Sequence, residues 1–183
     1  MQKRFLREKL VGNRIYLKKH QVELAQTMYE YINRDRKRLD QFLPWVEYIK
    51  TIEDELDYIK LTHQQWQNCT YFDYGIFDKN SDVYMGNIGV HGIQWEHNNA
   101  ELGYWILGDF EGKGFMTEAV RVLEEHLFDQ GFHRIQICCS DLNLRSAGVP
   151  KRAGYRFEGV LRENSIEKGQ YRNTRVYSKL VGE

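Results

Sequence analysis

A short glycine-rich segment contains the residues whose types could bind a ligand. Gly112 and Gly114 stand in a turn, residues 108–117, that is predicted to join a strand to a helix. The first turn of a helix exposes unpaired backbone N–H groups, and glycine lets the backbone approach a bound group closely. This combination favours a phosphate-binding loop. Two glycines also permit a tight turn with no ligand, so the segment by itself leaves both interpretations open.

The spacing of the glycines excludes two common phosphate-binding motifs. Only three residues separate Gly108 from Gly112, whereas a P-loop has four. Lys113 is followed by Gly114, whereas a P-loop lysine is followed by serine or threonine. Thr117 occupies the position at which a dinucleotide-binding fingerprint needs its third glycine. A phosphate bound here would therefore be held by a loop of a different kind.

The segments around this turn predict a chain of strands and helices. Hydrophobic periodicity and turn residues predict, in order, a strand, two helices, three strands, a helix, a strand, a helix and two strands. This order predicts an α+β fold, in which a mixed, mostly antiparallel sheet of about seven strands carries four helices on its two faces. The expected strands are residues 14–18, 71–77, 84–93, 100–107, 135–139, 155–161 and 172–181, and the expected helices are residues 22–33, 52–66, 116–129 and 144–153.

Length and charge narrow the class of protein. The chain has 183 residues, which fits a single domain over residues 1–183. Lysine plus arginine and aspartate plus glutamate both number 26, and this balance argues against a general nucleic-acid or anionic-membrane binder. The three cysteines lack the spacing of a zinc site, so no metal is expected. We recognise no signal peptide and no apolar stretch of membrane length, and we expect a cytoplasmic protein.

A basic cluster, residues 34–38, follows the first predicted helix. Cations near the C-terminal end of a helix offset its dipole, and charge runs usually lie on the surface, so a solvated helix end is the favoured interpretation. An anion site is the alternative. The cluster would also suit an acidic protein partner.

Six segments of the chain resemble one known family. They are residues 43–46, 101–106, 112–119, 143–146, 149–155 and 158–159. Together they resemble the GNAT acyl-CoA N-acyltransferase superfamily, and within it the RimL/RimJ branch of ribosomal-protein N-terminal acetyltransferases. The resemblance spans about residues 43–159. It implies a three-layer α/β/α GNAT fold, acetyl-CoA as co-substrate and a homodimer.

The resemblance also implies which residues bind the coenzyme. In this family the glycine loop wraps the pyrophosphate of coenzyme A through its backbone N–H groups, and the strand before the loop pairs with the pantetheine arm. Ile106 and Leu107 match that strand, and Asn143 matches an asparagine that contacts the coenzyme. The matching loop residues are Gly112, Lys113, Gly114, Phe115, Met116 and Thr117.

Three further residues are candidates for catalysis or acceptor binding. Ser146 matches the serine proposed to protonate the leaving thiolate, although a serine in the first turn of a helix often acts only as a cap. Glu101 lies on the strand that leads to the loop, where many family members carry a carboxylate, and is the candidate base; an exposed glutamate with no role is the alternative. Trp45 is a candidate for the acceptor side of the cleft, or alternatively a core residue.

Two positions depart from the family pattern. Glu111 stands where the loop usually begins with glutamine or arginine, and a carboxylate beside a pyrophosphate is unfavourable unless it points away. Ser165 stands where RimL-like enzymes place a glutamate as candidate base, so that assignment does not transfer. Glu163 and Glu167 are weaker candidates for the base.

The resemblance implies an acetyl-CoA-dependent N-acetyltransferase, and we expect it to transfer acetyl directly to an amine in a ternary complex. The expected acceptor is the N-terminal α-amine of a ribosomal protein, and a polyamine or aminoglycoside is the alternative. A non-catalytic acyl-CoA-binding module is a second alternative, which the departures at residues 111 and 165 keep open. A cysteine enzyme using Cys138 or Cys139 with His133 is the least favoured, because both thiols lie in an apolar strand.

Overall fold

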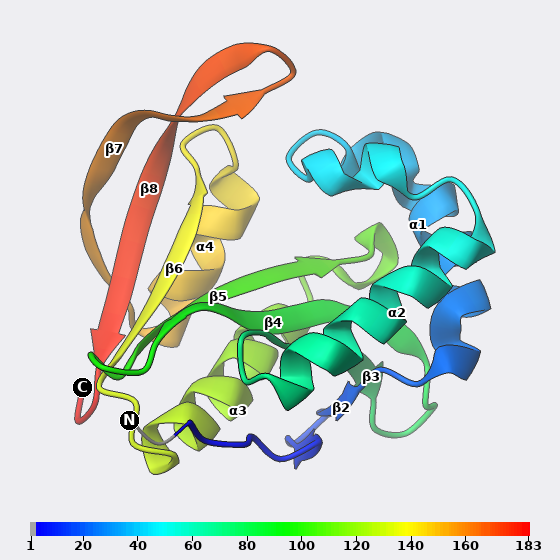
Figure 1. Ribbon diagram of the computed structural model, residues 1–183. Helices are drawn as coiled ribbons and strands as arrows, with labels where there is room; N and C mark the ends of the chain where they lie inside the picture. Colours follow the sequence, from blue (N-terminus) through cyan, green and yellow to red (C-terminus); the bar gives the residue numbers. More distant parts are fainter. Residues whose placement is uncertain (1–2) are drawn as a thin grey trace.

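A single sheet of eight strands forms the centre of the computed structural model, which describes residues 3–183 (Figure 1). The strands are β1 Lys9–Val11, β2 Ile15–Lys19, β3 Phe72–Asp78, β4 Tyr84–Gln94, β5 Asn99–Ile106, β6 Arg134–Ser140, β7 Arg156–Glu167 and β8 Gln170–Leu180. The helices are α1 Ala25–Leu39, α2 Ile52–Gln67, α3 Phe115–Asp129 and α4 Leu144–Ala153. Three short 3-10 helices are η1 Val22–Leu24, η2 Pro44–Tyr48 and η3 Gly108–Phe110.

The predicted order of elements is confirmed, with one strand more than expected. The strands lie in the order β1-β2-β3-β4-β5-β6-β8-β7, so the prediction of about seven strands was one short. The missed strand, β1, has only three residues, too few for an alternating pattern to be visible in the sequence. Helix α1 is also longer than predicted, because Met28, Ile32 and Leu39 continue one buried stripe to its end.

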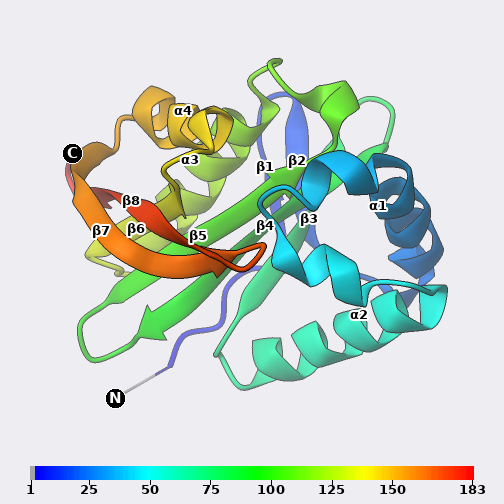
Figure 2. The same ribbon diagram turned by 90° about the horizontal axis from the view of Figure 1, so that it is seen from above.

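The sheet separates two layers of helices, as predicted. α1 and α2 cover one face, and α3 and α4 cover the other (Figures 1 and 2). Successive side chains of a strand point to opposite faces, so each strand contributes side chains to a hydrophobic core on either face of the sheet. Ile88 and Leu123 belong to the core beneath α3, whereas Ile59 and Tyr84 belong to the core beneath α2. Truncating one such leucine or isoleucine to alanine typically costs about 2–5 kcal/mol.

The N-terminus of α2 shows why a local pattern predicted its position correctly. Thr51 accepts a hydrogen bond from the backbone N–H of Asp54, and the Asp54 carboxylate accepts one from the backbone N–H of Thr51. This reciprocal capping box satisfies two N–H groups that the helix itself leaves unpaired.

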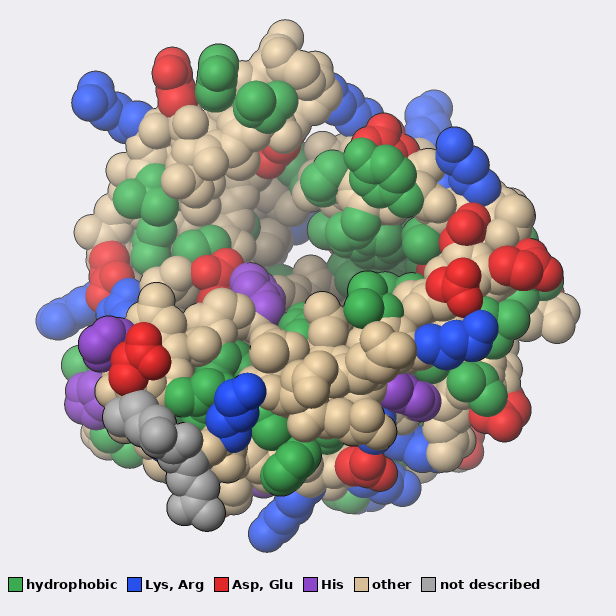
Figure 3. All heavy atoms as spheres, in the orientation of Figure 1, with side chains coloured by type: hydrophobic (Ala, Val, Ile, Leu, Met, Phe, Trp, Pro, Cys, Tyr) green, Lys and Arg blue, Asp and Glu red, His purple; other side chains and the backbone are tan. Residues whose placement is uncertain are grey.

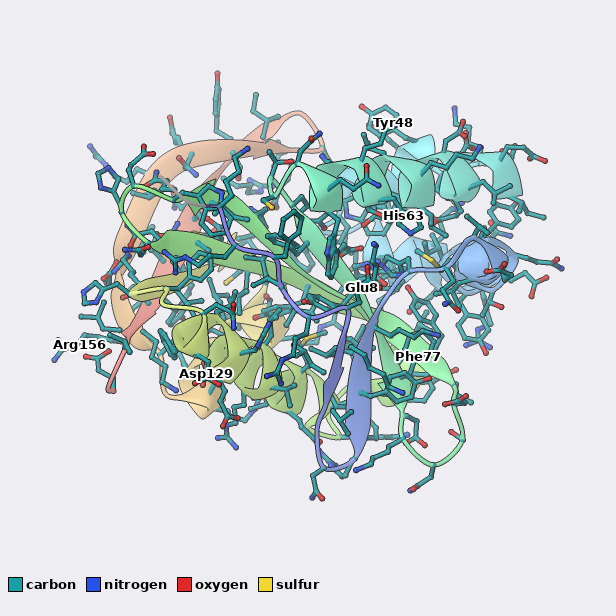
Figure 4. All side chains as sticks on the ribbon, turned by 60° about the horizontal axis from the view of Figure 1, so that its bottom comes forward. Glu8, Tyr48, His63, Phe77, Asp129 and Arg156 are labelled. Atoms are coloured by element: carbon teal, nitrogen blue, oxygen red, sulfur yellow. The ribbon has the colours of Figure 1, made fainter. Side chains whose placement is uncertain are left out.

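Further along α2, the ring of His63 lies 2.7 Å from the carbonyl of His20, and Figure 4 shows His63 between α2 and the N-terminal strands.

The centre of the sheet opens where β5 and β6 part. β5 stays paired with β4 as far as Ile106, which is opposite Gly86. Its parallel pairing with β6 covers only residues 99–101 against residues 134–136, after which β6 pairs with β8 alone. Figure 3 shows the molecule hollowed between α1 and η2 on one side and the β7–β8 hairpin on the other. Within residues 3–183, no helix is long and apolar enough to cross a membrane.

Candidate active site

The divergence of β5 and β6 creates a cleft of about 740 Å³. Its walls come from the end of α1, from β5, from the loop before α3 and from α4. Across the opening, Lys168 at the tip of the β7–β8 hairpin forms an ion pair of 2.8 Å with Asp40 at the end of α1. The sequence-predicted residues that line this cleft are Ile106, Gly112, Lys113, Gly114, Met116, Thr117, Asn143 and Ser146.

The glycine loop has the geometry of an anion-binding turn. Gly112 and Gly114 adopt φ angles of +73° and +82°, which L side chains rarely adopt. α3 begins directly after Gly114, and no side chain within residues 3–183 caps its first N–H groups. These N–H groups lie at the positive end of the helix dipole, beside the cleft-lining residues Met116 and Thr117. A phosphate group is the ligand that such a turn binds best.

Two arginines neutralise the unusual carboxylate of the loop. Arg38 donates a hydrogen bond of 2.6 Å to Glu111 and one of 2.6 Å to the carbonyl of Ile106, and it also pairs with Asp35. Arg145 donates a second bond of 3.0 Å to Glu111. Glu111 therefore holds two guanidinium groups at the cleft, where they can meet a diphosphate, and is not an isolated negative charge.

The basic cluster at residues 34–38 is only partly a solvated helix end. Arg34 pairs with Asp109 at the surface, as the favoured interpretation predicts. Arg36 instead donates to the carbonyls of Val46 and Ile49, and Arg38 lines the cleft. The surface interpretation is wrong for these two residues because α1 continues past residue 33 and turns them inward.

The open edge of β5 offers backbone groups to an extended ligand. The N–H of Leu107 donates to the carbonyl of Met85, within the sheet. Backbone groups of an antiparallel strand alternate between its two edges, so those of Ile106 point to the open edge. The side chain of Leu107 is fully buried and does not line the cleft. Of the two strand residues predicted to bind pantetheine, Ile106 therefore lies at the cleft and Leu107 lies in the core.

The N-terminus of α4 separates the roles of two predicted residues. The Asn143 side chain accepts a hydrogen bond of 3.1 Å from the backbone N–H of Ser146, which makes Asn143 the N-cap. The alternative in which Ser146 is the cap is wrong. The Ser146 hydroxyl instead lies in the cleft, 3.5 Å from the hydroxyl of Tyr104, which donates to the Ser146 carbonyl at 3.1 Å. Burial raises the pKa of Tyr104, so its phenol stays protonated at neutral pH.

Glu101 lies on the opposite face of β5 from Tyr104, at the last residue pair before the strands part. Gln136 donates a hydrogen bond of 2.8 Å to one carboxylate oxygen of Glu101, and Nε2 of His91 lies 3.9 Å from the other. The imidazole of His91 reaches over Gly103, whose missing side chain leaves the space. His91 went unnoticed in the sequence, because only the strand register places it opposite Glu101.

Two other predicted residues lie beside the cleft rather than in its lining. Trp45, half-buried in η2, packs its ring 5.7 Å from the ring of Trp105, a lining residue. It therefore supports the wall of the cleft from behind. Phe115 turns away from the cleft and packs 4.8 Å from the guanidinium of Arg14.

The cysteines do not form a nucleophilic site. Burial, together with the nearby Glu101 carboxylate, raises the pKa of Cys138 to about 12, and burial raises the pKa of Cys139. Thiols that stay protonated at neutral pH are poor nucleophiles. His133 precedes β6 and lies about 16 Å along the strand from Cys138. Within residues 3–183, no three His, Cys, Asp or Glu side chains are arranged to hold a metal ion.

Proteins similar to this chain in sequence or in fold are named as acetyltransferases. The ribosomal N-acetyltransferase candidate YdaF of Bacillus subtilis is 29% identical over 87% of both chains, and the ribosomal-protein-serine acetyltransferase of Escherichia coli is 25% identical over 86% of this chain and 87% of its own. The microcin self-immunity acetyltransferase MccE, solved with acetyl-CoA and AMP, superposes with a TM-score of 0.89 at 26% identity and covers 93% of this chain and 94% of its own. RimL, a ribosomal alpha-N-protein acetyltransferase solved with coenzyme A, shares the fold with a TM-score of 0.90 at 22% identity, over 95% of this chain and 98% of its own. The model of the acetyltransferase (GNAT) domain family matches residues 14–156, and the chain therefore belongs to the GNAT acetyltransferases.

Proposed function

We propose that this acetyltransferase transfers the acetyl group of acetyl-CoA to the N-terminal α-amine of a protein, by direct attack of the amine while both substrates are bound. The observation that carries the proposal is the placement of two candidate groups beside opposite faces of β5. Glu101 lies on the face of β5 that also carries the cleft-lining Trp105, whereas Ser146 of α4 lines the cleft beside Tyr104 on the other face. The amine approaches a thioester carbon from one side and the thiol departs on another. This separation therefore suits one proton acceptor and one proton donor.

The cleft fits the coenzyme of the family. Acetyl-CoA supplies an acetyl group activated as a thioester. The positive-φ glycines and uncapped N–H groups at the start of α3 suit its diphosphate, with Arg38 and Arg145 close by. The backbone N–H of Ile106 on the open edge of β5 is available to the pantetheine arm or to the thioester carbonyl oxygen, on which it can stabilise charge, whereas the carbonyl of Ile106 already accepts a hydrogen bond from Arg38.

On the acceptor side, Glu101 is the proposed base. An α-amine has a pKa near 8, so about 10% of it is already neutral at pH 7. A lysine amine, with a pKa near 10.4, would need about 4.6 kcal/mol of help to become neutral. Glu101 is held by Gln136 and has His91 beside it, so it can accept the proton of the attacking amine directly or through water.

On the coenzyme side, Ser146 is the proposed acid. Its hydroxyl is not used as a helix cap, because Asn143 has that role. Tyr104 contacts both the hydroxyl and the carbonyl of Ser146, and so it positions the serine. Ser146 can then donate its hydroxyl proton to the thiolate as the C–S bond breaks, and solvent in the open cleft can replace that proton.

The choice of acceptor is supported by the relatives, two of which are named as acting on, or as candidates for acting on, ribosomal proteins. A small amine is the alternative. We further propose that the enzyme is a cytoplasmic homodimer that does not bind nucleic acid. Light scattering at micromolar concentration should give about twice the 21.9 kDa chain mass, and a mass of one chain would reject the dimer.

The acceptor is tested by incubating the purified protein with acetyl-CoA and two pools of amines, while free coenzyme A is measured with a thiol reagent. One pool holds peptides with free N-terminal Ser, Ala, Met or Thr, and the other holds polyamines and aminoglycosides. Release driven by one peptide class supports the proposal. Release with the small amines alone would reject a protein acceptor and favour the alternative.

A further inference from the structure

A second hollow, of about 630 Å³, adjoins the cleft at the glycine loop. We call it the arginine hollow; its lining includes Arg14, Gly114, Thr117, Glu118, Arg121 and Arg152. Gly114, Thr117 and Arg152 line both the cleft and the arginine hollow, so the two spaces meet at the first turn of α3. A ligand whose diphosphate lies on the loop can therefore extend from the cleft into the hollow.

The arginine hollow carries excess positive charge. Arg14, before β2, is paired with Glu118 at 2.9 Å and donates to the carbonyl of Lys113, which ties it to the loop. Arg121 on α3 and Arg152 on α4 have no carboxylate partner within residues 3–183; Arg121 donates to the carbonyl of Arg152. A guanidinium has five N–H donors, so both groups keep donors for an anion.

The two guanidiniums are also held in place. Arg152 donates from Nε to the hydroxyl of Thr117 at 3.3 Å, and the bond from Arg121 links α3 to α4 at 2.7 Å. Gly114, Thr117 and Arg121 follow one another on the same face of α3, and Thr117 and Arg121 are about 6 Å apart along the helix axis. The positive charge is therefore displaced from the loop by little more than one helical turn.

We propose that the arginine hollow binds the 3′-phosphate of coenzyme A. In the coenzyme this phosphomonoester is attached to the ribose whose 5′ oxygen carries the diphosphate, so one sugar ring separates the two anions. With the diphosphate on the N–H groups of the loop, a phosphate one sugar ring away is within reach of Arg121 and Arg152, and guanidinium groups bind phosphate well. The inference rests on coenzyme binding and is independent of which amine is acetylated.

The test compares coenzyme A with 3′-dephospho-coenzyme A by isothermal titration, with no acceptor present. The native protein should bind coenzyme A about tenfold more tightly, the effect of one charge-assisted contact. Arg121→Gln should remove most of this preference and leave the affinity for the dephospho form unchanged. Arg156→Gln is the matched control. Figure 4 shows Arg156 on the side of the molecule where α3 ends at Asp129, far from the loop, and the preference should persist in this variant.

Two outcomes overturn the inference. Equal affinities of the native protein for the two nucleotides would mean that the hollow does not contact the 3′-phosphate. An equal loss for both nucleotides in Arg121→Gln would place the arginine on the diphosphate instead. A further titration measures the affinity for coenzyme A in the presence of inorganic phosphate at millimolar concentration. The phosphate should compete with coenzyme A only weakly, and strong competition with both nucleotides would indicate a free-phosphate site. A protein that binds neither nucleotide would contradict both the inference and the use of acetyl-CoA.

Discussion

Ser146, the proposed acid, does not cap its helix, because a neighbouring residue has that role. Asn143 uses the backbone N–H of Ser146, so replacing the serine side chain leaves the cap in place. We expect Ser146→Ala to lower kcat about 100-fold and to change the KM for acetyl-CoA by less than twofold. Steady-state kinetics with an identified acceptor measure both values. Ser140→Ala, outside the cleft on β6, is the control, and equal losses in kcat and coenzyme affinity would contradict the acid role.

Glu101, the proposed base, has Gln136 as hydrogen-bond donor to its carboxylate and His91 as neighbour. Glu101→Gln keeps the shape and the hydrogen bonding but cannot accept a proton. The rate at pH 7 should fall about 100-fold, and the loss should shrink as the pH rises and more of the amine is already neutral. Profiles of kcat/KM from pH 5.5 to 9 measure both effects. Glu96→Gln, on an exposed turn, should behave as the native enzyme, and an unchanged profile for Glu101→Gln would exclude the residue as base.

At the scale of the element, α4 begins at the cleft, so its cap connects stability with coenzyme binding. Asn143→Ala should lower the free energy of unfolding by about 1 kcal/mol, or roughly 2–4 °C in Tm, because the Ser146 N–H loses its acceptor. It should also weaken coenzyme A binding, since Asn143 lines the cleft.

The control for that prediction is Thr51→Ala, which removes the capping box of α2, far from the cleft lining. Thermal unfolding with and without coenzyme A separates the two effects. Both variants should lose similar stability, but only the α4 variant should lose affinity. Equal coenzyme affinities in the two variants would assign Asn143 a purely structural role.

At the scale of the whole molecule, stability should decline as the pH rises, because α2 buries a carboxyl group against the sheet. Glu55 is 1% exposed, and burial, with the nearby charge of Asp73, raises its pKa to about 7. The folded state therefore keeps a proton that the unfolded chain has lost above its ordinary pKa of 4.5. The folded state loses up to about 3 kcal/mol relative to the unfolded state as the pH rises through this window.

Glu55→Gln should remove this pH dependence. Between pH 5 and pH 8, the Tm of the native protein should fall by roughly 6–12 °C more than the Tm of the variant. Differential scanning calorimetry at both pH values provides the measurement. Glu53→Gln, at an exposed position on the same turn, is the control. Parallel curves for the native protein and Glu55→Gln would mean that the buried group does not titrate between folded and unfolded states.

The elements were predictable because their signals are local. The Thr51 capping box, the alternation in the strands and the glycines that end α3 and α4 all act within a few residues. The three-residue strand β1 was missed because it carries almost no pattern. The end of α1 was missed because the charged residues after position 33 hide a stripe that only packing reveals.

Local sequence also sufficed for the conformation of the glycine turn, because glycine adopts the positive φ angles that Gly112 and Gly114 have. The family followed from the resemblance of several segments together and not from the two glycines. The surroundings of the reactive groups were decided by tertiary structure. Arg38 reaches Glu111 across 73 residues of sequence, and His91 meets Glu101 through the strand register. Side chains from separate strands and helices acquire neighbours only when the sheet forms, and the parting of β5 from β6 then determines which of them face the cleft.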